Sequence, residues 1–165
     1  MSAWRHLNDL DEDDMAGLYY EQFEVGKTIK HAVTRTVTEM DNTLFTVMTM
    51  NNQPLHIDAH FAAESEFGQR LVNSIFTLGL VIGVSVNDTT LGTTIANLGM
   101  TDVRFPKPVF HGDTLSAETE VIAKRMSKSR ADAGIVEFEH RGNNQRGENV
   151  CICRRSAFMK CLPAG

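Results

Sequence analysis

The longest uncharged stretch of the chain runs from residue 71 to residue 87, and its apolar positions recur at spacings of four and three. This period predicts a helix, and since its other side is also mostly uncharged, we expect other elements to enclose it on nearly all sides. The stretch is short for a membrane span and contains polar and small residues, which favours a buried helix. The predicted apolar stripe is Leu71, Ile75, Leu78, Ile82 and Val86.

Alternating apolar and polar residues follow this helix and predict β-strands at 94–103, 115–122, 134–140 and 150–162. In the second of these, Leu115, Ala117, Thr119 and Val121 share one face, and in the third Glu137 and Glu139 point outward. The order of elements predicts an α+β fold, in which an antiparallel curled sheet wraps around one long apolar central helix.

The segment before the central helix is expected to be extended from 19 to 38 and then to form short helices. Thr36 or Thr38 could cap a helix that begins near Glu39, with Phe45, Met48 and Met50 on its apolar side. Asp58 could cap a second helix over 59–65. Residues 1–18 are expected to form a flexible N-terminal arm, and 19–165 a single domain.

Composition and charge argue against some classes of binding partner and indicate a cellular compartment. A net charge of −5 in 165 residues gives no electrostatic footprint for nucleic acid or for anionic membranes. The N-terminus lacks the pattern of a secretory signal, and three cysteines near one end do not form a disulfide framework, so we expect a cytoplasmic protein. Core packing is favoured over metal binding for Cys151, Cys153 and Cys161.

His56 is the first candidate for chemistry, because it lies in a polar loop and a histidine placed beside a substrate can serve as a general acid/base. Downstream, Asn73-Ser74 begins the long helix, whose first backbone N–H groups can hold a thioester carbonyl oxygen. The alternatives stay open here: a loop histidine can be merely exposed, and Asn73 and Ser74 can simply cap the helix.

Several motifs resemble the MaoC-like, R-specific enoyl-CoA hydratase family over residues 19–160. They are Phe23-x-Val25-Gly26, Arg35-Thr36-Val37-Thr38-Glu39, Gln53-Pro54-Leu55-His56-Ile57-Asp58, Phe67-Gly68, Val103-Arg104-Phe105-Pro106-x-Pro108-Val109 and Gly112-Asp113-Thr114-Leu115. The resemblance implies a hot-dog fold and a homodimer or higher homo-oligomer that binds acyl-CoA where protomers meet. It also implies hydration of an enoyl-CoA without a further cofactor.

The segments 50–56 and 71–78 are similar to itaconyl-CoA and mesaconyl-CoA hydratases of this family. The family's usual Asp, five residues before the histidine, is Asn51 here, its usual loop Asn is Gln53, and its usual His-Gly at the helix start is Asn73-Ser74. Asn51 can orient a water but cannot accept its proton. Asp58 could replace the missing carboxylate, although capping is favoured, and a thioesterase or a non-catalytic acyl-CoA-binding subunit stays an alternative.

Candidate cations for the substrate come from two regions. Lys128 and Arg130, in a basic turn, are plausible contacts for the coenzyme A phosphates, or else only an exposed hairpin tip. Arg104, and second to it Arg35, could pair with a substrate carboxylate, while an ion pair of Arg104 with Asp102 or Asp113 is the alternative.

Overall fold

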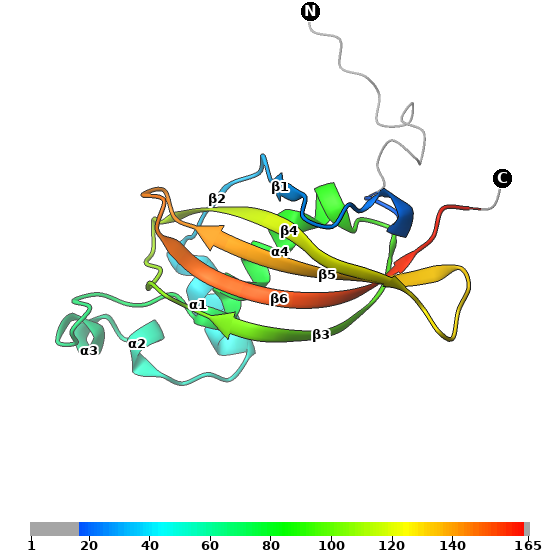
Figure 1. The fold of residues 1–165 in the computed structure, drawn as a ribbon. Coiled ribbons are helices and arrows are strands. Elements are labelled where there is room, and N and C mark those ends of the chain that lie inside the picture. Colours follow the sequence, from blue (N-terminus) through cyan, green and yellow to red (C-terminus); the bar gives the residue numbers. More distant parts are fainter. Residues whose placement is uncertain (1–16, 164–165) are drawn as a thin grey trace, which may run out of the picture.

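A strongly curved antiparallel sheet dominates the computed structural model, which describes residues 17–163 (Figure 1). Its strands pair in the order β1-β4-β5-β6-β3, and β2 pairs separately with β4. Long hairpins therefore build the sheet, and β3 is left as an edge strand. The strands are β1 (Thr28–Lys30), β2 (Arg35–Thr36), β3 (Thr94–Arg104), β4 (Thr114–Met126), β5 (Ala133–Asn143) and β6 (Asn149–Lys160).

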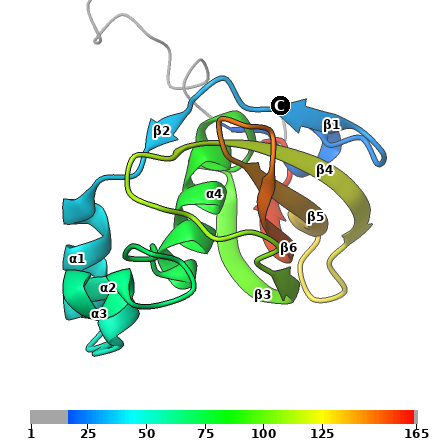
Figure 2. The same ribbon diagram turned by 90° about the vertical axis from the view of Figure 1, so that its left-hand side faces the viewer.

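The helix α4 (Ser74–Thr89) lies in the concavity of this sheet (Figure 2). Leu78, Val81 and Val84 form a buried cluster with Ala117 of β4 and with two cysteines of β6, Cys151 and Cys153. The predicted hot-dog fold is confirmed. Burial raises the pKa of the Cys151 thiol to about 12, and residues 17–163 contain no cluster of His, Cys, Asp and Glu that could hold a metal ion.

The predicted apolar stripe of α4 coincides with the buried face only at Leu78. Ile75 is 57% exposed, and Ile82 and Val86 are half-buried, whereas Val81, Ser85 and Thr89 face the sheet. The sheet covers only one side of the helix, so a stripe through Ile75, Gly79 and Gly83 stays open in a single chain. The expectation that other elements enclose α4 on nearly all sides was therefore wrong for one protomer.

Three short helices gather beside the N-terminal end of α4: α1 (Glu39–Met48), α2 (Pro54–Ile57) and α3 (Ala59–Ala63) (Figures 1 and 2). The side chain of Thr38 caps α1, and that of Asp58 caps α3 by accepting from two backbone N–H groups. The expected apolar side of α1 was wrong. Met48 is 73% exposed, while Asn42 and Thr46 are buried. The polar side chain of Asn42 can be buried because both its nitrogen and its oxygen form hydrogen bonds.

Residues 17 and 18 belong to the domain, which shortens the expected arm; residues 1–16 lie outside the described part. Gly17 donates to the carbonyl of Leu91 at 2.6 Å and Leu18 to that of Thr89 at 2.9 Å. A side chain at position 17 would collide with the backbone around Thr90, so only glycine permits this approach. Within 17–163, no helix is long and apolar enough to cross a membrane.

A chain of polar side chains crosses the core beneath the second half of α4. His31 Nδ1 contacts Asp88 at 2.7 Å, and its Nε2 contacts the hydroxyl of Thr119 at 2.8 Å. That hydroxyl lies 2.9 Å from Nδ1 of His140, whose Nε2 has no hydrogen-bond partner. Burial, with the nearby charge of Arg155 and then His31, lowers the pKa of His140 to about 3, so this imidazole is neutral.

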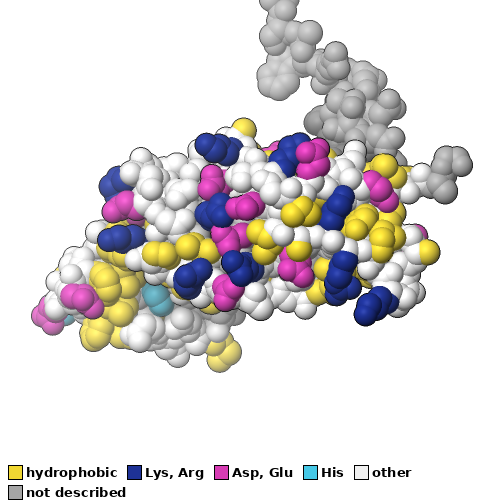
Figure 3. Space-filling view, in the orientation of Figure 1, with side chains coloured by type: hydrophobic (Ala, Val, Ile, Leu, Met, Phe, Trp, Pro, Cys, Tyr) yellow, Lys and Arg dark blue, Asp and Glu magenta, His cyan; other side chains and the backbone are white. Residues whose placement is uncertain are grey.

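The outer face of the sheet carries side chains of both charge signs, which intermingle in Figure 3. Arg141 contacts Glu120 and Glu139, each at 2.6 Å, and Glu139 also accepts from Arg154. The outward direction predicted for Glu139 is confirmed. In these pairs the charges of Arg141 and Arg154 are balanced by neighbouring glutamates on the same face of the sheet.

Candidate active site

His56 lies on α2, a single helical turn that begins at Pro54, where a fixed φ and a missing N–H are both tolerated. Its Nδ1 lies 3.0 Å from the carbonyl oxygen of Leu71. A carbonyl can only accept, so Nδ1 carries the proton and a neutral His56 has its lone pair on Nε2. Within the described chain Nε2 makes no hydrogen bond, and it is available as a proton acceptor.

The side chain of His56 lines a cavity of about 260 Å³ at the start of α4. Two residues with hydroxyl side chains, Ser74 and Thr77, and one cationic residue, Lys107, also border this cavity. The remaining wall is apolar, as the acyl part of a thioester requires. Its apolar residues include Phe67, Leu71, Val72, Phe105, Val109 and Val150.

At the start of α4, Ser74 borders the cavity, and the backbone N–H groups on either side of it are hydrogen-bonded. Asn73 donates its N–H to Oδ1 of Asn42 at 2.8 Å, and the N–H of Ile75 goes to the side chain of Asn73 at 3.0 Å. Ser74 lies between them, is exposed, and its N–H has no partner in the described chain. The helix start thus presents the N–H and hydroxyl of Ser74, while Asn73 serves as the cap.

Asn42 joins the separate parts of this site, and sequence reasoning missed it. It is fully buried on α1, and its Nδ2 donates to the carbonyls of Leu71 (2.9 Å) and His56 (3.1 Å). Its Oδ1 holds Asn73, at the cap of α4. Nδ2 also lies 3.0 Å from Nε2 of His111, so its two protons are shared among three neighbouring groups. Burial and the Arg70 charge lower the pKa of His111, which favours its neutral form.

Asn51 borders a second cavity, of about 210 Å³, on the other side of the start of α4. Phe45, Asn73 and Ile75 also line it, and His56 does not. The Oδ1 atom of Asn51 accepts from the N–H of Gln53 at 3.1 Å and so closes the turn before α2. A single protomer therefore does not place Asn51 in the cavity of His56. Gln53 is exposed, and its side chain makes no cap bond.

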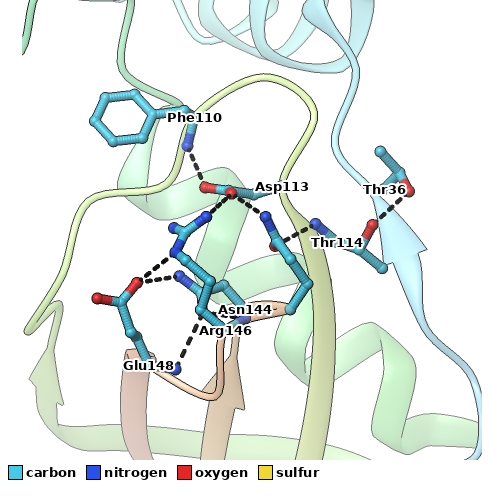
Figure 4. A network of polar contacts seen from close by, with 8 residues as sticks. Thr36, Phe110, Asp113, Thr114, Asn144, Arg146 and Glu148 are labelled. Carbon is cyan, nitrogen blue, oxygen red and sulfur yellow. Dashed lines mark hydrogen bonds and ion pairs between the residues drawn. The ribbon is translucent and has the colours of Figure 1, made fainter.

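The loop of residues 105–110 forms the wall opposite His56 and is held at its far end by Asp113 (Figure 4). Asp113 accepts from the N–H of Phe110 at 2.9 Å, and from Gln145 (2.7 Å) and Arg146 (3.0 Å) on the β5–β6 turn. Burial alone would raise the pKa of Asp113, but these hydrogen bonds lower it on balance. The clamp fixes the cavity wall to the sheet.

The four cations expected from the sequence do not border the cavity of His56. Arg35 pairs with Asp41 at 2.7 Å, and Arg104 is an exposed residue at the end of β3. The alternative ion pairs of Arg104 were wrong, because Asp102 pairs with Arg154 and Asp113 with Arg146. Lys128 and Arg130 lie on the β4–β5 hairpin, at the end of the domain opposite α2 and α3 (Figure 1), and Arg130 pairs with Asp132 at 2.6 Å.

Asp58, the possible replacement for the missing carboxylate, is occupied as the cap of α3 at 2.9 and 3.0 Å. Lys107 was the second residue that sequence reasoning missed. A signal for it existed, since a lysine between two prolines in a loop that interrupts a strand pattern has a restricted backbone. No pattern signalled Asn42, because a buried amide in a helix has no sequence signature.

Comparison with known proteins agrees with this geometry. A mesaconyl-CoA hydratase of Cereibacter sphaeroides is 37% identical over 135 residues, which are 82% of this chain and 39% of that protein. A β-methylmalyl-CoA dehydratase of Chloroflexus aurantiacus is 36% identical over 134 residues, 81% of this chain and 38% of its own length. The chain thus spans about two fifths of these curated relatives.

Among solved structures, a monoamine oxidase regulatory protein from Archaeoglobus fulgius superposes with a TM-score of 0.78 and 34% identity. The superposition covers 89% of this chain and 97% of that one. The model of the MaoC like domain matches residues 21–144, which include the sheet up to β5, α4 and the loop of His56. The chain therefore belongs to the MaoC-like domain family.

Proposed function

We propose that this domain adds water to the double bond of an α,β-unsaturated acyl-CoA, or removes it in the reverse direction. The observation that carries the proposal is the convergence of two groups on one apolar cavity. These are an imidazole whose tautomer is fixed by Leu71 and the unpartnered N–H of Ser74. A base and an oxyanion donor beside an apolar wall are what hydration of an enoyl thioester requires.

In the proposed reaction, Nε2 of His56 takes a proton from water as the water oxygen bonds to Cβ. The electron pair of the double bond moves toward the thioester, and the enolate-like oxygen accepts from the N–H of Ser74. A proton then returns to Cα, which completes the addition of water. Asn51, expected from the sequence to orient the water, lines the neighbouring cavity in one protomer and is given no contact with the water in this scheme. No cofactor is needed beyond the coenzyme A of the substrate.

For the substrate, we propose a C5 dicarboxylic enoyl-CoA, such as mesaconyl-CoA or itaconyl-CoA. The names of the two curated relatives support this choice. Asn51 supports it further, since a carboxylate at this position would repel the second carboxylate of the substrate, whereas an amide does not.

A homodimer is part of the proposal. β3 is an unpaired edge strand, and the neighbouring stripe of α4 through Ile75, Gly79 and Gly83 is open. An exposed strand edge beside an apolar helix face favours pairing with a second copy. Such pairing would bring the sites of two protomers close together and offers cations of one protomer to a substrate held by the other.

Two assays on the same enzyme test the proposal. Loss of enoyl-thioester absorbance with mesaconyl-CoA, without release of free thiol, is the expected result. Release of thiol would instead identify a thioesterase, although no carboxylate borders the cavity within residues 17–163. Binding without either reaction would identify a non-catalytic acyl-CoA-binding subunit.

A further inference from the structure

Lys107 is the one cation among the described residues that border the cavity of His56. It lies between Pro106 and Pro108, in the loop that leads from the end of β3 to Phe110. Described carboxylates do not reach it, since none lies within 4.0 Å of its ammonium group. Lys107 is exposed and forms no ion pair in the described chain. Its charge influences the carboxyl group of Glu148, whose pKa is lowered mainly by Asn144 and Arg146 and least by Lys107.

Several other cations of the described chain form ion pairs. Arg70 pairs with Glu39, Arg146 pairs with both Asp113 and Glu148, and Arg35 pairs with Asp41. An anionic group that enters the cavity would meet Lys107 and none of these. An apolar wall with one cation that forms no ion pair is suited to a ligand that is apolar except for one negative charge.

Lys107 is also held at a fixed place relative to His56. Leu71, whose carbonyl accepts from His56, forms an antiparallel bridge with Phe110. Next to this bridge the N–H of Val72 donates to the carbonyl of Val109 at 2.9 Å. The far end of the loop is fixed by the hydrogen bond of Phe110 to Asp113. The two sides of the cavity are thus joined through backbone hydrogen bonds, and substrate can span them without rearranging the loop.

We infer that Lys107 determines specificity by pairing with the free carboxylate of a dicarboxylic acyl-CoA while His56 faces the reacting carbon. This inference rests on the proposed function and deepens it. It replaces Arg104 and Arg35 as the partners of that carboxylate, since neither borders the cavity. The coenzyme A phosphates are a second source of negative charge for the same ammonium group, and the experiment must separate the two sources.

The test uses Lys107→Met, which keeps an unbranched apolar stem, and Lys107→Arg, which keeps the charge. The ratio of kcat/KM for mesaconyl-CoA to kcat/KM for crotonyl-CoA is measured in each. A charged hydrogen bond of ordinary strength predicts that Lys107→Met lowers this ratio by about 10-fold to 100-fold. Lys107→Arg should restore most of it. Lys27→Met, at an exposed lysine remote from the cavity, is the matched control.

Two results would overturn the inference. An equal loss for both substrates in Lys107→Met would assign Lys107 to the phosphates, which both substrates carry. An unchanged ratio, with little loss for either, would leave Lys107 without a role in selection. Binding of two saturated analogues, methylsuccinyl-CoA and butyryl-CoA, is measured by calorimetry in the same variants. If no enoyl-CoA is hydrated, the proposed function fails, but a charge-selective loss of binding in Lys107→Met would still support the inference.

Discussion

The carbonyl oxygen of Leu71 accepts a 3.0 Å hydrogen bond from Nδ1 of His56, which leaves Nε2 as the one nitrogen that can take a proton from water. The same carbonyl accepts from Asn42 at 2.9 Å. The orientation of the proposed base therefore depends on one backbone group, and that group depends on a buried amide.

Replacing His56 by Ala should lower kcat by at least about 10²-fold, because general acid–base help is typically worth that much or more. The side chain is only half-buried, so the variant should keep its circular dichroism spectrum and its melting temperature within a few degrees. Steady-state kinetics with mesaconyl-CoA give the measurement, and His60→Ala, at an exposed histidine of α3, is the control. Near-normal turnover of His56→Ala would rule out the mechanism.

Replacing Asn42 by Ala should cost roughly 2 to 3 kcal/mol of unfolding free energy, because the N–H of Asn73 and two carbonyls lose their partner. Urea denaturation measures this loss.

Asn42→Asp separates the two functions of the amide. The carboxylate can accept from Asn73 but cannot donate to Leu71 O, so kcat should fall more than KM changes, even where the variant is folded. The control is Asn52→Ala, whose exposed side chain makes no hydrogen bond within the described residues. If both Asn42 variants lose stability but keep an unchanged kcat, Asn42 has a structural role only and does not position His56.

Acid should destabilise the domain through His140. Its pKa is about 3 in the fold, against an ordinary value of 6.5, so the unfolded chain binds more protons between these values. Stability is thus complete above about pH 6.5 and is lost as the pH falls toward 3, by roughly 5 kcal/mol at the limit. His140→Gln should flatten this part of the curve, measured by urea unfolding from pH 7 to pH 4. Equal slopes in the variant and the wild type would contradict the account, and His60→Gln is the control.

A second copy should cover the open stripe of α4. A side chain at Gly83 would meet nothing within 4 Å in one protomer, so Gly83→Glu should leave the fold intact. In a dimer it would bury a charge at the interface, and sedimentation should show a shift from dimer to monomer with loss of activity. Ser129→Glu, on the exposed β4–β5 hairpin, should stay dimeric. A wild-type monomer with full activity would overturn the prediction.

Asn51→Asp should shift preference toward an uncharged substrate. Two negative charges about 6 Å apart, at an effective dielectric constant near 20, repel by roughly 3 kcal/mol, or about 10²-fold in binding. The ratio of kcat/KM for mesaconyl-CoA to that for crotonyl-CoA should fall by up to this factor. If crotonyl-CoA is the better substrate of the natural sequence, the electrostatic explanation of Asn51 fails.

Periodicity was sufficient for the fold, since alternation located four strands and the caps at Thr38 and Asp58 located two short helices. It failed where a face is defined by partners distant in sequence. The buried side of α1 is polar because Asn42 finds its partners at residues 56, 71 and 73. The open stripe of α4 also has no local cause, because the sheet simply ends at β3.

For the site, the sequence identified His56 and the start of α4 but not the residues that hold them. Arg104 and Arg35 were expected at the substrate because their neighbours in sequence suggested it. Arg35 forms an ion pair with Asp41 and does not border the cavity. Arg104 is an exposed residue at the end of β3 and does not border it either. Lys107 borders the cavity instead, on a loop that the Leu71–Phe110 bridge joins to the segment before α4, a contact between segments that are remote along the chain.

The attachment of α1 has a consequence for local opening. This helix buries no large apolar side chain completely and is held mainly by the hydrogen bonds of Asn42, whereas β5 lies between two long strands. Segments with few buried apolar contacts open with a lower free energy than the core. Amide protons of 39–48 should therefore exchange faster than those of 135–142, and substrate should slow the former selectively. Opening of α1 would release Asn42 and disassemble the site while the sheet stays folded.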